Sequence, residues 1–138
     1  MNRLLDTVTV SELRRLDRAD PSVLEWSQKV KASIHWISVV TVMEIQAGIH
    51  NVRPKDPDFA ALLSGWLESQ VIPSFIGRML NVNLAIAKQA AEYRACYGLS
   101  QNDSLIGATA KVHGLALVTR NIKDFENTGI SLENPWDF

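Results

Sequence analysis

Short apolar runs alternate along the chain with stretches whose apolar residues recur at helical spacing. The clearest runs cover residues 34–38 and 115–119, which we interpret as strands, and weaker signals predict short strands at 3–5, 78–82 and 130–132. Helical spacing with start and stop signals predicts helices at residues 11–16, 21–30, 39–49, 59–71, 84–97 and 102–113, the last opened by Asn102 or Asp103 and ended by Gly114. Strands that alternate with helices pair in parallel through right-handed crossovers, so the pattern predicts an α/β fold with helices on both faces of a small, mainly parallel sheet.

The predicted helix at 39–49 is the most apolar one in the chain. Apolar residues cover most of its surface, including Met43, and leave only Thr41, Glu44 and Gly48 on one narrow stripe. We therefore expect this helix to be largely buried. An ionised carboxylate on such a helix is costly unless it is paired or bound to a metal, so Glu44 requires an explanation.

Length and composition are those of one globular domain, which we expect to span residues 1–138. The chain has 138 residues, of which 46% are hydrophobic and 21% charged. Its one cysteine, Cys96, excludes a disulfide scaffold and favours a reducing, cytoplasmic compartment. No apolar run reaches the roughly 18 residues of a membrane span, and Asp6 comes too early for a signal peptide.

The overall charge argues against a protein that holds nucleic acid by phosphate contacts alone. Fourteen Lys and Arg residues face fifteen Asp and Glu residues, for a formal net charge of −1. Any nucleic-acid role must therefore be local. Arg14, Arg15 and Arg18, or Arg120 with Lys123, could form a small basic patch, although solvated helix faces or loops explain them more simply.

Three acids fall where the predicted strands end or the next helices begin. Asp6 follows the first strand, Glu44 lies early in the helix after the second, and Asp103 begins the helix before the strand at 115–119. Asn121 and Asp124 follow that strand at the same rim, where α/β sheets gather their ligands. Carboxylate oxygens without a His or Cys partner suit Mg²⁺ or Mn²⁺, which can activate water for attack on a phosphodiester.

Each of these residues also has a simpler interpretation. Asp103 could be only a helix cap, Asp6 only a turn residue, and Glu44 could pair with Arg120. His35, His50 and His113 lack the spacing of metal ligands, and we interpret them as surface or loop residues. A serine hydrolase is disfavoured because neither Ser11 nor Ser38 has a His/Asp set that the sequence can place.

Nine short segments carry a family resemblance. They cover residues 4–7 (Leu4-Leu5-Asp6-Thr7), 10–14, 37–45, 48–49, 103–110, 113–115, 117–121, 124–125 and 132–136. Their order and spacing are similar to those of PIN-domain toxins of the VapC type, and closest to the FitB-like branch. The resemblance implies a PIN-like three-layer α/β/α sandwich and an endoribonuclease that depends on Mg²⁺ or Mn²⁺. It also implies the toxin half of a bacterial type II toxin–antitoxin pair, with RNA as substrate, a cognate antitoxin as partner and a homodimer as the assembly.

The resemblance assigns roles to the polar residues of the rim. By position, Asp6, Glu44 and Asp103 are the metal-site carboxylates, and Asn121 takes the fourth catalytic position, which is often Asp in the wider family and frequently Asn in this branch. The groups around them are Asp124, Thr7, Ser38 and Arg120.

One departure from the family pattern leaves an alternative open. The first motif commonly reads Asp-Thr-Asn, and here its third residue is Val8. An asparagine there could orient the first carboxylate or a bound water, and the loss of such a partner typically costs a metal site roughly 10- to 100-fold. The alternative is a weakened pseudo-nuclease that keeps the fold and binds partners.

A second alternative belongs to another class, the phosphoacceptor receiver domains. Such a domain needs an acidic pair after its first strand and a lysine after its last core strand. Here Leu5 precedes Asp6, and the strand at 115–119 is followed by Arg120 and Asn121, so both features are missing.

Overall fold

A five-stranded sheet forms the centre of the fold in the computed structural model, which describes residues 2–138 except for the side chain of Ser33. The strands are β1 (Arg3–Leu5), β2 (His35–Ser38), β3 (Met79–Leu80), β4 (Ala116–Val118) and β5 (Leu132–Glu133). Their spatial order is β3-β2-β1-β4-β5, and every neighbouring pair is parallel. The first strand of the chain is thus the central strand, and the expected parallel sheet is confirmed.

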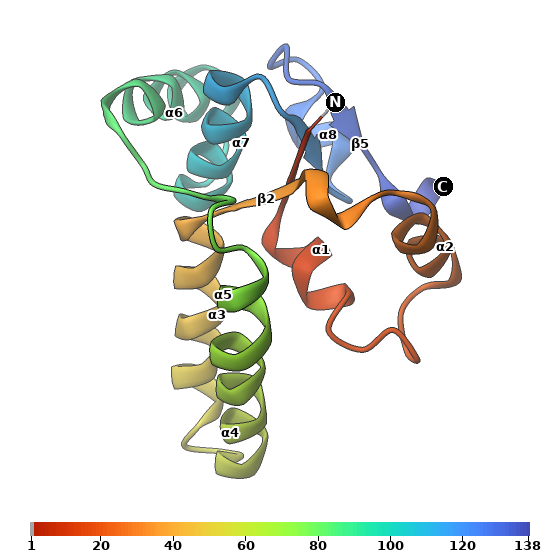
Figure 1. Ribbon diagram of the computed structural model, residues 1–138. Helices are drawn as coiled ribbons and strands as arrows, with labels where there is room; N and C mark the ends of the chain where they lie inside the picture. Colours follow the sequence, from red (N-terminus) through yellow and green to blue (C-terminus); the bar gives the residue numbers. More distant parts are fainter. Residues whose placement is uncertain (1) are drawn as a thin grey trace.

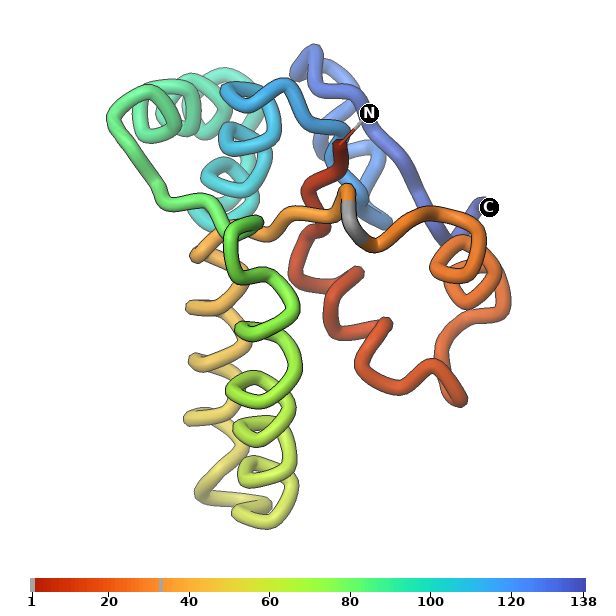
Figure 2. The backbone as a smooth tube through the Cα atoms, viewed as in Figure 1, coloured from red at the N-terminus to blue at the C-terminus, as the bar shows by residue number. Residues whose placement is uncertain are grey.

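The helices that surround the sheet are mostly those the sequence predicts. They are α1 (Thr7–Glu12), α2 (Pro21–Lys29), α3 (Val39–Val52), α4 (Pro57–Trp66), α5 (Ile72–Ser74), α6 (Leu84–Tyr97), α7 (Gln101–His113) and α8 (Ile122–Phe125). One π-helical segment (Leu67–Val71) joins α4 to α5, and two 3-10 segments cover Ala32–Ile34 and Pro135–Asp137. The tube drawing in Figure 2 shows α3 and α4 running side by side, away from the sheet.

Apolar side chains of alternate strand positions fill two cores, one on each face of the sheet. Leu4 and Leu117 belong to one core together with residues of α6, among them Ile86 and Tyr93, and of α7. On the other face, Leu5 packs in a core with residues of α1 to α4. Successive strand residues point to opposite faces. The result is the three-layer α/β/α arrangement visible in Figure 1.

Side-chain caps explain where several helices begin. Asp20 accepts a hydrogen bond from the Ser22 N–H with Pro21 at the first helical position, as predicted. Helix α7 begins one residue earlier than predicted, because its cap is the Ser100 hydroxyl rather than Asn102 or Asp103. Gly114 ends this helix in the left-handed region (φ 64°), where glycine carries no steric penalty.

Other expectations about elements are wrong. The first helix spans Thr7–Glu12 instead of 11–16, because Asp6 caps it directly after β1, and Leu16 is exposed. The last strand lies two residues later than the predicted start at residue 130. Helix α3 is not buried all round: Met43 is 50% exposed, since the sheet and α4 cover only part of its circumference.

His35 also departs from expectation, because it is a core residue. Its ring is 5% exposed and stacks on Trp26, with ring centroids 5.0 Å apart and planes 4° from parallel. Burial, and then the charges of Arg3 and Arg78, lower its pKa to about 4 against the opposing effect of Glu133. Among the described residues its buried Nε2 has no hydrogen-bond partner.

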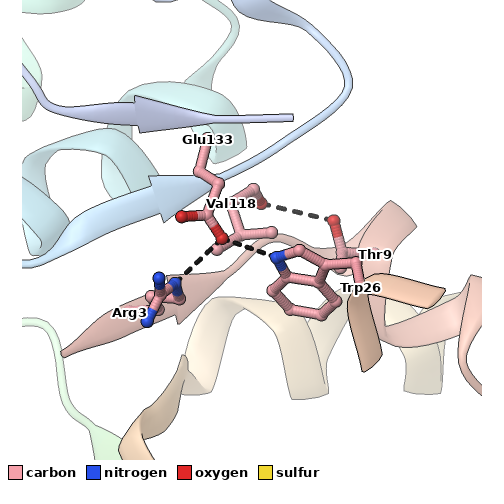
Figure 3. Close-up of polar contacts among 5 residues, drawn as sticks. All are labelled: Arg3, Thr9, Trp26, Val118 and Glu133. Carbon is pink, nitrogen blue, oxygen red and sulfur yellow. Dashed lines mark hydrogen bonds and ion pairs between the residues drawn. The ribbon is translucent and has the colours of Figure 1, made fainter. Parts of the chain in front are cut away.

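Glu133 ties three elements together next to this histidine (Figure 3). Its Oε2 accepts hydrogen bonds from Arg3 Nε at 2.8 Å and from Trp26 Nε1 at 2.6 Å. Burial alone would raise the pKa of Glu133, but these two hydrogen bonds and the nearby positive charges lower it. The contacts fix α2 and β5 against the central strand.

No helix within the described residues is long and apolar enough to cross a membrane.

Candidate active site

The carboxylate of Asp6 is held rigidly at the end of β1. Asp6 caps α1, and its Oδ1 accepts hydrogen bonds from the Thr9 N–H at 2.9 Å and from the Thr9 hydroxyl at 2.7 Å. The Thr9 hydroxyl also lies 3.3 Å from the carbonyl oxygen of Val118 on β4 (Figure 3). The end of the central strand therefore presents a carboxylate with a fixed orientation. Asp6 is therefore a helix cap as well as a candidate metal ligand.

Glu44 projects from α3, the helix that follows β2. The Thr7 hydroxyl donates to its Oε1 at 2.6 Å and lies 3.1 Å from the Thr41 hydroxyl. The Asn102 amide on α7 donates to Oε2 at 3.3 Å. Hydrogen bonds from two other helices thus compensate for the carboxylate on this apolar helix.

Pairing of Glu44 with Arg120 does not occur among the described contacts. The guanidinium of Arg120 instead lies over the ring of Trp136, with its carbon 5.4 Å from the ring centroid. Arg120 is exposed and leaves the acid cluster free of a direct cationic partner in the described part of the chain.

Asp103 lies in the first turn of α7, close enough to other acids for their charges to affect its pKa. Burial raises its pKa, a hydrogen bond with the Ser100 side chain opposes this, and the negative charges of Glu44, Asp6 and Asp124 raise it further. The residue between β1 and α1, together with α3, α7 and α8, therefore brings acids close enough for their charges to act on Asp103.

Of the other predicted site residues, Thr7 contacts an acid, Ser38 caps a helix and Asn121 has an exposed side chain. Asn121 precedes α8, where its N–H donates to the Thr119 hydroxyl at 3.0 Å, and its exposed side chain makes no cap. Ser38 is buried and caps α3 by accepting from the Val40 N–H at 3.0 Å, so its contacts are structural. Thr7 touches Glu44, as described above.

Three residues that hold the acids were missed from the sequence: Thr9, Ser100 and Asn102. Two of these contacts could have been predicted from the sequence, because a capping residue commonly bonds to the residue three positions later. Asp6 with Thr9 and Ser100 with Asp103 both have this spacing. The contact of Asn102 with Glu44 could not have been predicted, since it depends on how α3 and α7 pack.

The donor chemistry of the cluster fits a hard divalent cation, while its spacing is not that of a formed metal centre. Carboxylate oxygens are the ligands that Mg²⁺ and Mn²⁺ prefer. Burial raises the pKa of Asp103 most, and the negative charges of Glu44, Asp6 and Asp124 raise it further, so a cation beside Asp103 would relieve that part of the effect. Over residues 2–138, however, no group of three or more Asp, Glu, His and Cys side chains is arranged so that it could hold a metal ion.

A three-layer sandwich with acids at the carboxyl ends of its central parallel strands is the architecture of a PIN-like protein. The PIN domain family model matches residues 3–130, so the chain belongs to this family. A VapC ribonuclease of Sinorhizobium fredii is 30% identical over 139 residues, which are 97% of each chain. The toxin FitB of Neisseria gonorrhoeae is 30% identical over 141 residues, which cover 96% of this chain and 97% of FitB.

Solved structures agree with the sequence relatives. The crystal structure of FitAcB from Neisseria gonorrhoeae superimposes with a TM-score of 0.86 at 28% identity and covers 98% of this chain and 99% of that one. A FitAB complex bound to a DNA fragment gives a TM-score of 0.85 at 27% identity, covering 96% of this chain and 94% of its own. The expected PIN-like fold is thereby confirmed.

Proposed function

We propose that this PIN-domain protein is a metal-dependent endoribonuclease and the toxin of a toxin–antitoxin pair. One observation carries the proposal: Glu44 of α3 accepts hydrogen bonds from Thr7 and Asn102, the direct sequence neighbours of Asp6 and Asp103, so three acids from separate parts of the chain meet. The names of the relatives support the same activity, since one is a VapC ribonuclease and another the toxin FitB. RNA as substrate would place its action in the cytoplasm.

Asp6, Glu44 and Asp103 are the residues that would hold Mg²⁺ or Mn²⁺, with Asn121 as a fourth catalytic group. A bound divalent ion polarises a phosphoryl oxygen and lowers the pKa of water. The chain's own contribution is orientation. Thr9 fixes Asp6, and Thr7 with Asn102 fixes both oxygens of Glu44. Preset acids avoid the cost of ordering them when substrate binds.

A cognate antitoxin is the proposed protein partner, and a groove beside α4 suits it. This groove, of about 840 Å³, is lined by cationic side chains and by aromatic and aliphatic ones: Arg14, Arg15, Arg18, Phe59, Leu62 and Trp66. An amphipathic segment with acidic residues would match both kinds of surface. The solved relatives include toxin–antitoxin complexes, which supports a partner of this kind. We also propose a homodimer, as the family resemblance implies.

The experiment is RNA cleavage by the purified protein with and without metal. Wild-type protein should cut RNA in Mg²⁺ or Mn²⁺, and EDTA should abolish cutting. Asp103→Asn should lose turnover by several orders of magnitude with an unchanged circular dichroism spectrum. Glu68→Gln, at an exposed acid of the π-helical segment Leu67–Val71, should cut normally. Full-rate cleavage in excess EDTA would show that the metal proposal is wrong.

Val8 supports the alternative of a weakened nuclease, and it can be tested directly. Its side chain is 50% exposed and offers no hydrogen bond, so Val8→Asn should fold normally. We expect Val8→Asn to raise the single-turnover rate by up to about tenfold, the low end for such partners, because Thr9 already holds Asp6. Val8→Thr is the control without an amide. Equal, negligible rates for wild type and Val8→Asn would favour the pseudo-nuclease.

A further inference from the structure

A polar cavity of about 380 Å³ opens beside Asp103, at the edge of the acid cluster. It lies between the α6–α7 connection and the segment that contains α8. Its chemically active lining residues are Tyr97, Ser100, Asp103, Lys123, Asp124 and Asn127. The volume lies at the lower end of the range for small-molecule pockets, which suits a ligand of one nucleotide.

Tyr97 presents an aromatic ring to this cavity from the last position of α6. The residue is 42% exposed, although its ring packs edge-to-face on that of the buried Tyr93, with the ring centroids 6.0 Å apart. Gly98 follows in the left-handed region (φ 66°), so the chain turns away directly after the tyrosine. A buried neighbour therefore orients the ring while part of it remains open for stacking.

The charged residues that line the cavity indicate which kind of ligand it could bind. Lys123 is the one cationic side chain among the lining residues that the structure describes, and the lining also contains the carboxylates of Asp103 and Asp124. A bare anion would be repelled by the two acids. A ligand with one phosphate for the lysine and an uncharged ring and hydroxyl groups for the rest fits better. Asn127 and Ser100 add amide and hydroxyl groups for hydrogen bonds.

We infer that this cavity is a subsite for a nucleotide of single-stranded RNA that flanks the scissile phosphodiester. Tyr97 stacks on its base, Lys123 pairs with its phosphate, and Asn127 contacts the edge of the base. Unstacked bases on aromatic side chains are the usual mode of single-strand recognition. The inference rests on the proposed ribonuclease function, because Asp103 joins the cavity to the acid cluster.

Binding can be measured without turnover in a Glu44→Gln background, since Glu44 does not line the cavity. The probe is a fluorescein-labelled single-stranded RNA of mixed sequence, followed by anisotropy. Tyr97→Leu should weaken binding about tenfold, the effect of one lost stacking contact, and Tyr97→Phe should bind like the parent. Lys123→Ala should lower the slope of log affinity against log salt by about one, whereas Lys88→Ala, an exposed lysine of α6, should not.

Cleavage mapping with otherwise wild-type protein gives a readout that altered stability would not move. Asn127→Ala should change the base preferred at one position next to the cut, with an unchanged melting temperature. Cleavage by wild type together with unaltered affinity and cut sites in the Tyr97→Leu and Asn127→Ala proteins would overturn the subsite and leave the proposed function standing. Wild-type protein that neither binds nor cuts RNA would overturn both. If Tyr97→Leu weakens only antitoxin binding, the cavity belongs to the antitoxin interface and the subsite is wrong.

Discussion

Thr9 is a positioning residue for Asp6, since its backbone N–H and its hydroxyl both bond to Oδ1. Thr9→Val removes only the second of these bonds. The Val118 carbonyl keeps its bond from the Asp6 N–H at 3.0 Å, so β4 should stay in place.

We expect Thr9→Val to lower the single-turnover cleavage rate roughly 10- to 100-fold, the usual loss when a group that orients a ligand is removed. Thr9→Ser, which keeps the hydroxyl, should retain most of the rate. Rates are compared at equal folded fraction, checked by thermal melting. Equal rates for the Val and Ser proteins would contradict a positioning role for this hydroxyl.

His35 makes stability sensitive to acid. Its pKa of about 4 lies below the value of 6.5 for an unfolded histidine, so between these pH values the unfolded chain takes up a proton that the folded protein does not. Stability is therefore greatest above pH 6.5 and falls as the pH drops towards 4, by up to about 3 kcal/mol from this group. The pKa of Glu133 is lowered, so its contribution fades in the same direction at lower pH.

Replacing His35 by Phe should remove most of this dependence, because Phe keeps the stack on Trp26 and cannot take up a proton. Denaturant unfolding at pH 7, 5.5 and 4.5 measures it. Wild type should lose more stability than His35→Phe across this range. The control His50→Asn, at an exposed histidine, should follow wild type. Parallel curves for wild type and His35→Phe would show that the ring is not the group responsible.

At the scale of elements, α7 packs so closely on its neighbours that one glycine is required. A Cβ at Gly107 would lie 2.9 Å from Cε1 of the buried Phe125 and 3.3 Å from Cδ1 of Ile130. A Cβ at Gly48 on α3 would meet nothing within 4 Å. An alanine at Gly107 would therefore test packing, and an alanine at Gly48 would test helix propensity alone.

We expect Gly107→Ala to destabilise the protein by about 1–3 kcal/mol, as overpacking does. Gly48→Ala should instead stabilise it by about 0.5–1 kcal/mol, because alanine is the better helix former. Urea unfolding of both variants provides the measurement. A stabilising effect at both positions would mean that Phe125 has room to move.

Most elements could be predicted from the sequence because their signals are local. The Asp20-Pro21 cap, the glycine stop at 114 and the apolar strand at β4 depend only on neighbouring residues. The exposure of Met43 and the burial of His35 could not be predicted, since they depend on which face of an element another helix covers. The start of α1 was missed because Asp6 was interpreted as a ligand, and its capping role was overlooked.

At the scale of the whole molecule, the proposed metal site predicts that the acids around Asp103 destabilise the protein when no cation is bound. Mg²⁺ or Mn²⁺ at millimolar concentration should therefore raise the melting temperature by several degrees. Asp103→Asn should melt higher than wild type without metal, since it removes a charge on which three acids act, and should respond less to metal. Glu68→Gln is the matched control. Equal melting temperatures in every sample would mean that the acids do not share a site.

The acid site could be predicted in outline because parallel strands all end at one rim. Asp6 and Glu44 follow neighbouring strands, and the crossover brings Asp103 to the same place. The hydrogen bonds around the acids could not be predicted, because a contact such as Asn102 to Glu44 joins helices 58 positions apart. The spacing of the carboxylates was equally beyond the sequence, and metal binding stays a prediction.

Because β1 lies between β2 and β4, it can pair with β2 early in synthesis, whereas its second neighbour, β4, comes much later in the chain. Arg3, Leu4 and Leu5 pair with Ala116, Leu117 and Val118, and a ribosome adding about 5–20 residues per second needs on the order of ten seconds to cover that interval. Until then Asp6 has no β4 beside it, and Asp103 has only just been made. A nascent chain therefore carries no assembled acid site. On the proposed function, a toxin built in this order would be unable to attack RNA while it is still being translated.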